Sequence, residues 1–472
     1  MKSILFLLLF VPQFLAAQDS IARSAAWTIV EAVHDTIAAR HPFSFLGDNR
    51  AKLADALSRI KPRLDELLES RPGDSLTYSE VIGLAAPLQE VTECGHTMLR
   101  RKKSPKLKKA LDARPPQIRT MMLEDGRYVL IMPLAVGEDT LAVGTEIVEY
   151  EGRPLPFLVE ELSVFYGVND HGFQEGVRSI IAQSIDYYFQ SLHGPRDTVS
   201  ISIAGSSEPI NYRIPLLIEK NESSEKTESK TKNKYVIKAE FNDERTVGYL
   251  NVPSFNDRSF RPKHVRKAIA EINAAGVDKL IIDVRGNLGG DLGNTNYLFR
   301  LLAREPFVRL EKFESYSPNA KPKNFFSRLA NSLLFGLRHD GDRYHKPKYL
   351  KYTKPVAARH RFTGDVVVMI NGSTFSAASL FAHYVQSYGR GELVGTVSGG
   401  SNRVSYGGRN KSYPIGPNGE LFLRMMNFRL DLPNPGSGNL TPDHLLPATL
   451  EMLKTAGDDR RGFSEEVLLG KQ

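Results

Sequence analysis

Residues 366–379 read Val-Val-Val-Met-Ile-Asn-Gly-Ser-Thr-Phe-Ser-Ala-Ala-Ser and carry the clearest structural signal in this 472-residue chain. The opening apolar run predicts a buried strand, and the small polar residues after it predict a tight turn into the apolar segment 380–384. Ser376 would then lie at a helix N-terminus, where free backbone N–H groups favour negative charge. That environment suits an attacking oxygen and its oxyanion, although serine is also a common helix cap.

A second apolar strand, predicted at residues 279–284, runs into a loop that reads Arg-Gly-Asn-Leu-Gly-Gly at 285–290. Its glycines permit positive φ and allow another backbone or a ligand to come close. No Lys-Ser/Thr pair follows Gly290, so the loop is not a nucleotide-binding P-loop. Strands that alternate with helices predict an α/β fold, with the functional site at the carboxyl ends of the strands.

Taken together, I-I-D-x-R-G-N-x-G-G at 281–290 and N-G-x-x-x-S-A-A at 371–378 resemble the C-terminal-processing and tricorn-core family of serine peptidases. The segment 247–255 resembles the first core strand of that family, and the likeness covers residues 235–453. The resemblance implies a layered core of the crotonase or ClpP type. It also implies that Ser376 is the nucleophile, with an oxyanion hole formed by the loop at Gly289 and Gly290 and by the amide of Ala377.

The general base departs from the commonest family pattern. Many members carry a lysine downstream of the serine, but Ser401 stands at that position here. The nearby Arg403 stays protonated and cannot act as a base. The tricorn-like branch uses a histidine from a segment before the core, and residues 93–97, Glu-Cys-Gly-His-Thr, resemble that segment. A histidine is largely neutral at physiological pH, so we predict His96 as the base.

Other interpretations of these residues were weighed. His444 is the main rival to His96, because it lies in the segment that resembles the core of the family. His383 would lie about 10 Å along a helix from Ser376, too far to take its proton directly. Cys94 next to His96 suggests a cysteine nucleophile or a metal pair. Two ligands fall short of a structural zinc site, so we expect no metal and no cofactor.

A base also needs an orienting acid, and the sequence leaves its identity open. The tricorn-like pattern has a serine directly before the histidine and a glutamate late in the chain, where this sequence has Gly95 and Thr441. Asp443, Glu420 and Glu93 remain candidates for the acid. The missing residues keep a second hypothesis open, a catalytically inactive peptide- or ligand-binding protein on the same fold. A crotonase-type acyl-CoA enzyme is a third.

At 472 residues the chain exceeds what one hydrophobic core usually supports. Residues 51–68 place Leu53, Leu57, Ile60, Leu64 and Leu67 at helical spacing, with a kink or break expected at Pro62. Residues 141–152 resemble a PDZ-like module, and residues 319–352 predict a basic, irregular surface insertion. The predicted organisation is a signal peptide (1–17), an N-terminal helical domain carrying His96 (18–115), a degenerate PDZ-like β-rich module with one helix (116–218), a flexible linker (219–234), an α/β peptidase core (235–458) and a C-terminal tail (459–472).

The N-terminus predicts export to the periplasm or the extracellular space. Residues 1–17 contain a lysine, an apolar stretch and then small residues, as in a secretory signal peptide, and the stretch is too short to span a bilayer. Cys94 is the one cysteine, so no internal disulfide can form. Residues 100–109 hold seven basic residues and no acid. In an exported protein they favour contact with solvent or an anionic envelope surface over nucleic acid. The expected partner is a polypeptide substrate, and an oligomer remains open.

Overall fold

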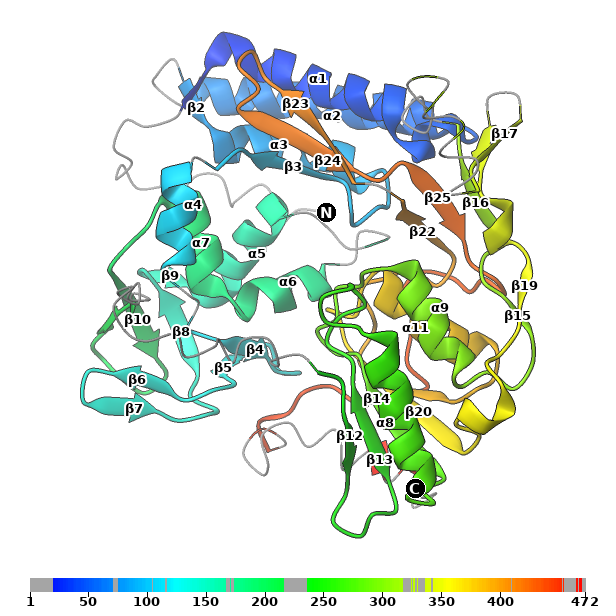
Figure 1. Ribbon diagram of the computed structural model, residues 1–472. Helices are drawn as coiled ribbons and strands as arrows, with labels where there is room; N and C mark the ends of the chain where they lie inside the picture. The colour runs from blue at the N-terminus through cyan, green and yellow to red at the C-terminus, as the bar shows by residue number, and fades with distance from the viewer. Residues whose placement is uncertain are drawn as a thin grey trace, which may run out of the picture.

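The structure is a computed structural model of the chain, shown in Figure 1. It describes residues 20–70, 75–103, 105–114, 117–166, 170, 174–215, 236–316, 324, 326, 329, 336–340, 343–408, 410–451, 453, 464–465 and 467–468. The predicted signal peptide and linker, and most of the predicted tail, lie outside the described residues. We refer below to the N-terminal region (20–103), the middle module (105–215) and the core region (236–451).

Three helices dominate the N-terminal region: α1 (Arg23–Arg40), α2 (Asn49–Glu69) and α3 (Tyr78–Glu90). The predicted stripe is confirmed, since Leu53, Ile60, Leu64 and Leu67 are buried and Leu57 packs against them. Of the kink or break predicted at Pro62, the break is wrong, because α2 runs through Pro62 as one helix, and the kink stays a prediction. The smaller elements are β1 (Ser20–Ala22), η1 (Pro42–Phe45), β2 (Ser75–Thr77) and β3 (Met98–Arg101).

A hairpin from far along the chain completes this region. The turn residues Pro417, Asn418 and Gly419 predict a hairpin in the sequence. The structure confirms it: strands β23 (Lys411–Ile415) and β24 (Leu421–Met425) form this hairpin, and β24 pairs antiparallel with β3. Ile415, Leu421 and Leu423 are buried in the same apolar cluster as α1, α2 and α3. Figure 1 shows the orange hairpin lying along the blue helices. The N-terminal region therefore shares one hydrophobic core with a hairpin that belongs to the core region in sequence.

The middle module packs helices against a four-stranded sheet with the order β11-β10-β8-β9. We predicted one helix after residue 116, and this is wrong, because apolar stripes on three helices pack together with the sheet. The helices are α5 (Leu155–Tyr166), α6 (Glu175–Ala182) and α7 (Ile185–His193), with α4 (Pro105–Asp112) packed on α7. The strands are β4 (Thr120–Met122), β5 (Tyr128–Leu130), β6 (Leu134–Val136), β7 (Asp139–Leu141), β8 (Ile147–Tyr150), β9 (Arg153–Pro154), β10 (Thr198–Ile203) and β11 (Ile210–Arg213).

The core region is built on a six-stranded sheet with the order β12-β13-β14-β20-β21-β26, parallel except at β12. Its strands are β12 (Ala239–Phe241), β13 (Gly248–Asn251), β14 (Lys279–Asp283), β20 (Asp365–Ile370), β21 (Glu392–Gly395) and β26 (His444–Leu445), and its helices are α8 (Pro262–Ala274), α9 (Leu292–Arg300) and α11 (Ala377–Ser387). The predicted α/β alternation is confirmed. Successive strand residues bury opposite faces: Ile282 and Val368 pack in the cluster that contains the helices, whereas Ile281 and Val367 pack on the other side.

A second sheet flanks the first, with the order β17-β18-β16-β25-β22. Part of the insertion predicted as irregular belongs to it, since β17 and β18 lie within residues 319–352. The remaining elements are β15 (Phe307–Val308), β16 (Lys312–Ser315), β17 (Arg338–Asp340), β18 (Arg343–His345), η5 (Pro347–Tyr349), β19 (Tyr352–Thr353), η6 (Ala358–His360), β22 (Val404–Gly407) and β25 (Phe428–Asp431). Within the described part of the chain, no helix has the length and apolar character needed to cross a membrane.

Candidate active site

Two loops meet at the carboxyl edge of the central sheet. Strands β14 and β20 are parallel neighbours, so the loops that follow them leave the sheet side by side. The backbone N–H of Phe375 donates to the carbonyl of Asn287 at 3.0 Å, and the N–H of Gly286 donates to Asn371 Oδ1 at 3.0 Å. The glycine-rich loop and the serine turn, predicted separately from sequence, therefore form one hydrogen-bonded unit.

Ser376 occupies a strained position in this unit. Its backbone has φ 55° and ψ −121°, a conformation that non-glycine residues rarely adopt and that costs about 1–3 kcal/mol. It directly precedes α11, but its side chain makes no capping hydrogen bond to the helix. The hydroxyl instead lies 3.1 Å from Nε2 of His96. This geometry separates Ser376 from a serine that only caps a helix.

His96 comes from the loop between α3 and β3, 280 residues before Ser376 in the chain. Its ring packs on Phe375 with the ring centroids 4.7 Å apart. Burial, and secondly the positive charge of Arg424, lower the pKa of His96 to about 4. The imidazole is therefore neutral at pH 7, as a group that accepts a proton from serine must be.

The second ring nitrogen of His96 has no orienting acid among the described residues. For Nε2 to accept the Ser376 proton, Nδ1 must carry the ring hydrogen. Nδ1 is buried, and among the described residues it has no hydrogen-bond partner. An unsatisfied buried donor costs about 1–3 kcal/mol. The neutral tautomer that the reaction needs is thus not fixed by a partner within the described part of the chain.

Two of the predicted acids hydrogen-bond to groups away from His96. Asp443 accepts the backbone N–H of Leu393 at 2.7 Å and the side-chain amide of Gln386 at 2.9 Å. Glu420 accepts the N–H of Asn418 at 3.0 Å in the β23–β24 turn. Neither contact involves the His96 ring, and the side chain of Glu93 is exposed.

The two other histidines that we weighed also have partners away from Ser376. His444 lies 3.0 Å from Glu392, an exposed neighbour on the adjacent strand β21. The ring nitrogens of His383 lie 2.6 Å from Asn402 Oδ1 and 2.6 Å from the carbonyl of Pro433. The described contacts therefore bring His96, and not His444, to Ser376.

His41 holds the residue that follows His96. Its Nδ1 accepts the backbone N–H of Phe43 at 3.1 Å, so Nε2 carries the ring hydrogen and donates to Thr97 Oγ1 at 3.0 Å. Burial, with a smaller effect of His96, lowers the pKa of His41 to about 3. Sequence reasoning missed this residue, and its one local signal is a lone histidine at the end of a helical pattern.

Asp170 holds the residue that precedes His96. Its Oδ1 accepts the N–H of Gly95 at 2.9 Å, and its Oδ2 accepts the N–H of Ser401 at 3.2 Å. Ser401 is the position where the family resemblance led us to look for a lysine base. Sequence reasoning missed Asp170 because no motif surrounds it. A polar Asn-Asp-His cluster at 169–171, between two apolar helical stretches, is the signal that could have drawn attention to it.

The candidate oxyanion donors differ in whether their backbone N–H groups already have an acceptor. Gly289 donates its N–H to Asn287 Oδ1 at 2.8 Å, so this amide is already engaged. Gly290 forms a parallel bridge with Phe255 that uses the Gly289 carbonyl and the Asp291 N–H, which leaves the N–H of Gly290 outside the bridge. Ala377 is the first residue of α11, and its N–H has no acceptor within the helix.

Neither metal nor thiol chemistry finds support in the described contacts. Among the described residues, no group of three His, Cys, Asp or Glu side chains could hold a metal ion. Cys94 is buried, and burial, followed by the charge of Asp170, raises the pKa of its thiol to about 12. A thiol with so high a pKa is a poor nucleophile at neutral pH, which disfavours Cys94 as the attacking group.

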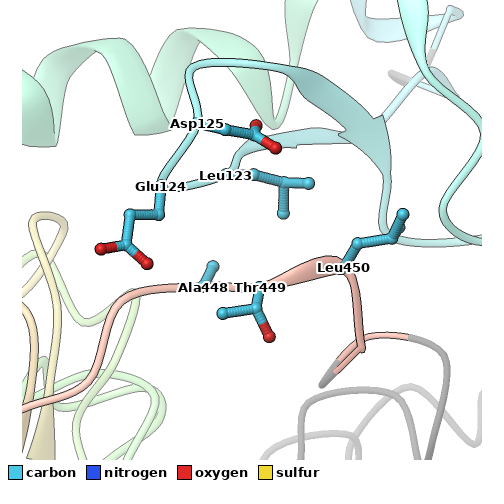
Figure 2. A pocket seen from close by; sticks show the side chains of 6 residues that line it. All are labelled: Leu123, Glu124, Asp125, Ala448, Thr449 and Leu450. Atoms are coloured by element: carbon cyan, nitrogen blue, oxygen red, sulfur yellow. The ribbon is translucent and has the colours of Figure 1, made fainter.

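A cavity of about 240 Å³ lies away from these residues. Figure 2 shows it between the β4–β5 turn of the middle module and the chain that follows β26. The lining residues are Leu123, Glu124, Asp125, Ala448, Thr449 and Leu450. Glu124 donates its N–H to the carbonyl of Ala448 at 3.1 Å. The cavity thus marks a contact between two parts of the chain, and neither Ser376 nor His96 lines it.

Comparison with solved structures finds the same fold in CPAF. Mature CPAF is 14% identical, with 94% of this chain and 96% of that chain covered and a TM-score of 0.60. A CPAF point mutant, also 14% identical with the same coverage, gives a TM-score of 0.62. Mature CPAF complexed with lactacystin is 13% identical, with 95% and 99% covered and a TM-score of 0.61. At these identities the likeness is one of fold alone.

No curated protein sequence matches the chain. The model of peptidase family S41 matches residues 246–424. That range contains the glycine-rich loop after β14 and the Ser376 turn after β20, so it confirms the family resemblance inferred from those motifs. The match to the S41 model in residues 246–424 therefore supports a serine-type peptidase.

Proposed function

We propose that the chain is an exported serine endopeptidase or tail-processing peptidase that works through a Ser376 acyl-enzyme with His96 as general base. The observation that carries this proposal is the distance of 3.1 Å between Ser376 Oγ and the Nε2 of a neutral histidine. The predicted signal peptide supports export, and the sheet supports a core of the crotonase or ClpP type. The middle module would hold the substrate tail as an added strand, in the manner of a PDZ-like module.

The mechanism follows from the placement of these groups. Ser376 Oγ attacks the peptide carbonyl while His96 Nε2 takes the hydroxyl proton. The N–H groups of Ala377 and Gly290 stabilise the oxyanion, and Gly289 contributes by shaping the loop. His96 then gives the proton to the leaving amine, and water releases the acyl group. Each oxyanion donor contributes about 10²–10³ in rate.

One observation favours the alternative function. The buried Nδ1 of His96 has no partner among the described residues, so no acid holds the catalytic tautomer there. A binding protein on the same fold does not require that acid. In such a protein the loops around Ser376 would bind a peptide or another ligand without cleaving it.

A fluorophosphonate probe separates the two functions. We expect the purified mature protein to be labelled at Ser376, as mapped by mass spectrometry, and labelling and hydrolysis to be lost in Ser376→Ala and His96→Ala with folding intact. Ser373→Ala is the matched control, because Ser373 lies in the same turn and its buried hydroxyl has no partner among the described residues. It should label at the wild-type rate. Unchanged turnover in Ser376→Ala would sink the assignment, and an unlabelled wild type would favour the binding protein.

A further inference from the structure

One buried carboxylate of the middle module, that of Asp170, contacts the loops that carry the catalytic residues. The side chain of Asp170 is fully buried, in a segment between α5 and α6. Both of its oxygens accept backbone N–H groups, one from the His96 loop and one from the loop at residues 399–401. Its own backbone N–H donates to the carbonyl of Gly399 at 3.2 Å. Asp170 therefore joins three parts of the chain that are far apart in sequence.

The loop at 399–401 in turn supports the serine turn. Gly399 donates its N–H to the carbonyl of Thr374 at 3.0 Å. A Cβ added to Gly400 would lie 3.5 Å from the backbone nitrogen of Ser376 and would overlap the side chain of Ser379. A displacement of this loop would therefore be transmitted directly to the nucleophile.

A second close approach places the middle module against the same turn. A Cβ added to Gly372 would lie 2.9 Å from the Cα of Gly176, at the start of α6. Two glycine backbones are thus in direct contact there, four residues before Ser376. The middle module touches the site on the His96 side through Asp170 and on the serine side through α6.

We propose, on the basis of the function given above, that Asp170 is a positioning residue that holds the His96 loop and the Ser376 turn at their working separation. It contacts no reacting atom. It acts through Gly95, which directly precedes His96, and through Ser401, whose loop is bonded to the turn. A displacement of about 1 Å at such a site can cost about 10²-fold in rate.

The two bonds favour the ionised carboxylate. An ionised carboxyl group accepts strongly at both oxygens, whereas a protonated one carries a hydrogen on one oxygen and accepts an N–H there only weakly. Burial raises the pKa of Asp170 to about 7, with the bonds from Gly95 and Ser401 acting in the opposite direction. Protonation of Asp170 below that pKa should therefore weaken its bonds from Gly95 and Ser401, while His96 stays neutral down to about pH 4.

The described groups whose pKa is raised by the charge of Asp170 are Cys94 and Tyr406, and both are neutral in this range. Burial raises the pKa of the Cys94 thiol to about 12, and burial raises that of the Tyr406 hydroxyl, with the charge of Asp170 adding to each shift. His96, on the same loop as Gly95, has a lowered pKa. Asp170 is thus the group among these whose charge changes near pH 7, and the activity should rise as it ionises.

The experiment measures the rate of fluorophosphonate labelling of Ser376 against pH in the full mature protein. We expect the wild-type rate to rise with a midpoint near pH 7. In Asp170→Asn the rate at pH 8 should fall by about 10- to 100-fold, and the pH dependence should move towards the pKa of His96. A wild-type midpoint near 4, or an Asp170→Asn variant that keeps the wild-type rate and midpoint, would overturn the proposal.

Asp186→Asn is the matched control. Asp186 is also a buried carboxylate that accepts two backbone N–H groups, those of Gln117 and Ile118, each at 3.0 Å, but it lies wholly within the middle module. Its loss should lower stability and leave the pH midpoint of labelling unchanged. A shift of the midpoint in this variant would show that general loosening is enough, and would count against the proposal.

Amide hydrogen exchange keeps the two proposals distinguishable. In Asp170→Asn, exchange should rise at residues 94–97 and 399–401 together, and in Asp186→Asn it should not. An unlabelled wild type would remove the proposed function, and the exchange result would still decide whether Asp170 holds the two loops. Unchanged exchange at both segments would overturn the positioning role, whatever the labelling shows.

Discussion

The Ser376 turn and the His96 loop lie within hydrogen-bond distance of each other but are built in different ways. The turn is held by bonds between two loops that leave neighbouring strands of one sheet. The His96 loop is held by residues from three distant places: His41 from the start of the chain, Asp170 from the middle module, and β24 through its pairing with β3. The nucleophile is therefore set by the local core, and the base by long-range packing.

Because of this difference, substitutions in the two parts of the site should have different effects on activity and stability. A change that displaces Ser376 or its oxyanion donors should damage the chemistry and leave the packing between regions intact. A change in the supports of His96 should lower stability and activity together, because the same contacts hold the base and join the regions. The comparison can be tested on one glycine and on two side chains that touch neither the substrate nor the serine.

Gly289→Ala should have the largest effect. A Cβ at Gly289 would lie 2.8 Å from both the backbone nitrogen of Ala377 and the Cβ of Ser376, and φ there is +100°, which strains any side chain. The added methyl group displaces the nucleophile and an oxyanion donor together, so we expect kcat/KM to fall by about 10²-fold or more. The measurement is the rate of Ser376 labelling beside that of peptide hydrolysis.

Gly286→Ala supplies the control for the strain. Gly286 lies in the same loop with φ +71°, but a Cβ there would meet nothing within 4 Å. This variant should lose stability through the backbone alone and keep most of its activity. Equal losses of activity in the two variants would mean that backbone strain, and not contact with Ser376, explains the result for Gly289.

His41→Ala should have the next largest effect and should act through the other half of the site. The change removes a fully buried ring and its bond to Thr97, and we expect a loss of about 3 kcal/mol in the free energy of unfolding. Labelling of Ser376 should fall by about 10-fold, because the chain next to His96 loses its anchor. Denaturant unfolding and labelling of the same samples measure both.

The free energy of unfolding of the wild type should also depend on pH because of His41. Its folded-state pKa, about 3, lies below the usual 6.5, so its contribution is complete above pH 6.5 and is lost as the pH falls towards 3. His41→Ala should flatten this part of the curve. His193→Ala, which removes another histidine of lowered pKa in the middle module, should also flatten the acid side of the curve, but without slowing labelling. Slower labelling in both would remove the special role of His41.

The sequence predicted the parts of the site that are locally encoded. Periodicity and turn residues were enough to predict β14, β20, the glycine-rich loop, the Ser376 turn and the β23–β24 hairpin. His96 was found by resemblance, because one histidine in a loop has no periodic signal of its own. Asp170 and His41 were missed because burial of a polar side chain against a distant backbone leaves no mark on the neighbouring residues.

The fold shows the same division. The helices of the N-terminal region were readable from their apolar spacing, but the hairpin at 411–425 that completes their core was not assigned to them. Asn287 was also missed, although the residues beside it were singled out. The glycines beside it were singled out, whereas the side chain of Asn287, which takes up the Gly289 amide, reads in sequence as an ordinary loop residue.

Arg424→Gln should have the smallest effect and should sharpen the comparison most. Arg424 lies on β24 opposite Met98, two residues after His96, and its charge is the second cause, after burial, of the lowered pKa of His96. Removing a positive charge stabilises the imidazolium, so the pKa of His96 should rise. The strand pairing uses backbone groups and should survive. An NMR titration of the His96 ring measures the shift directly.

Arg101→Gln is the matched control for this prediction. Arg101 lies on β3, five residues after His96, but its guanidinium stacks on the ring of Tyr78 with its carbon 4.5 Å from the ring centroid. Its charge is not among the causes of the His96 shift, so the pKa should stay in place. A rise in the Arg424 variant alone would show that a strand of the core region tunes the base carried by the N-terminal region. An unchanged pKa in both variants would leave burial as the whole cause, and β24 would then act on His96 through packing only.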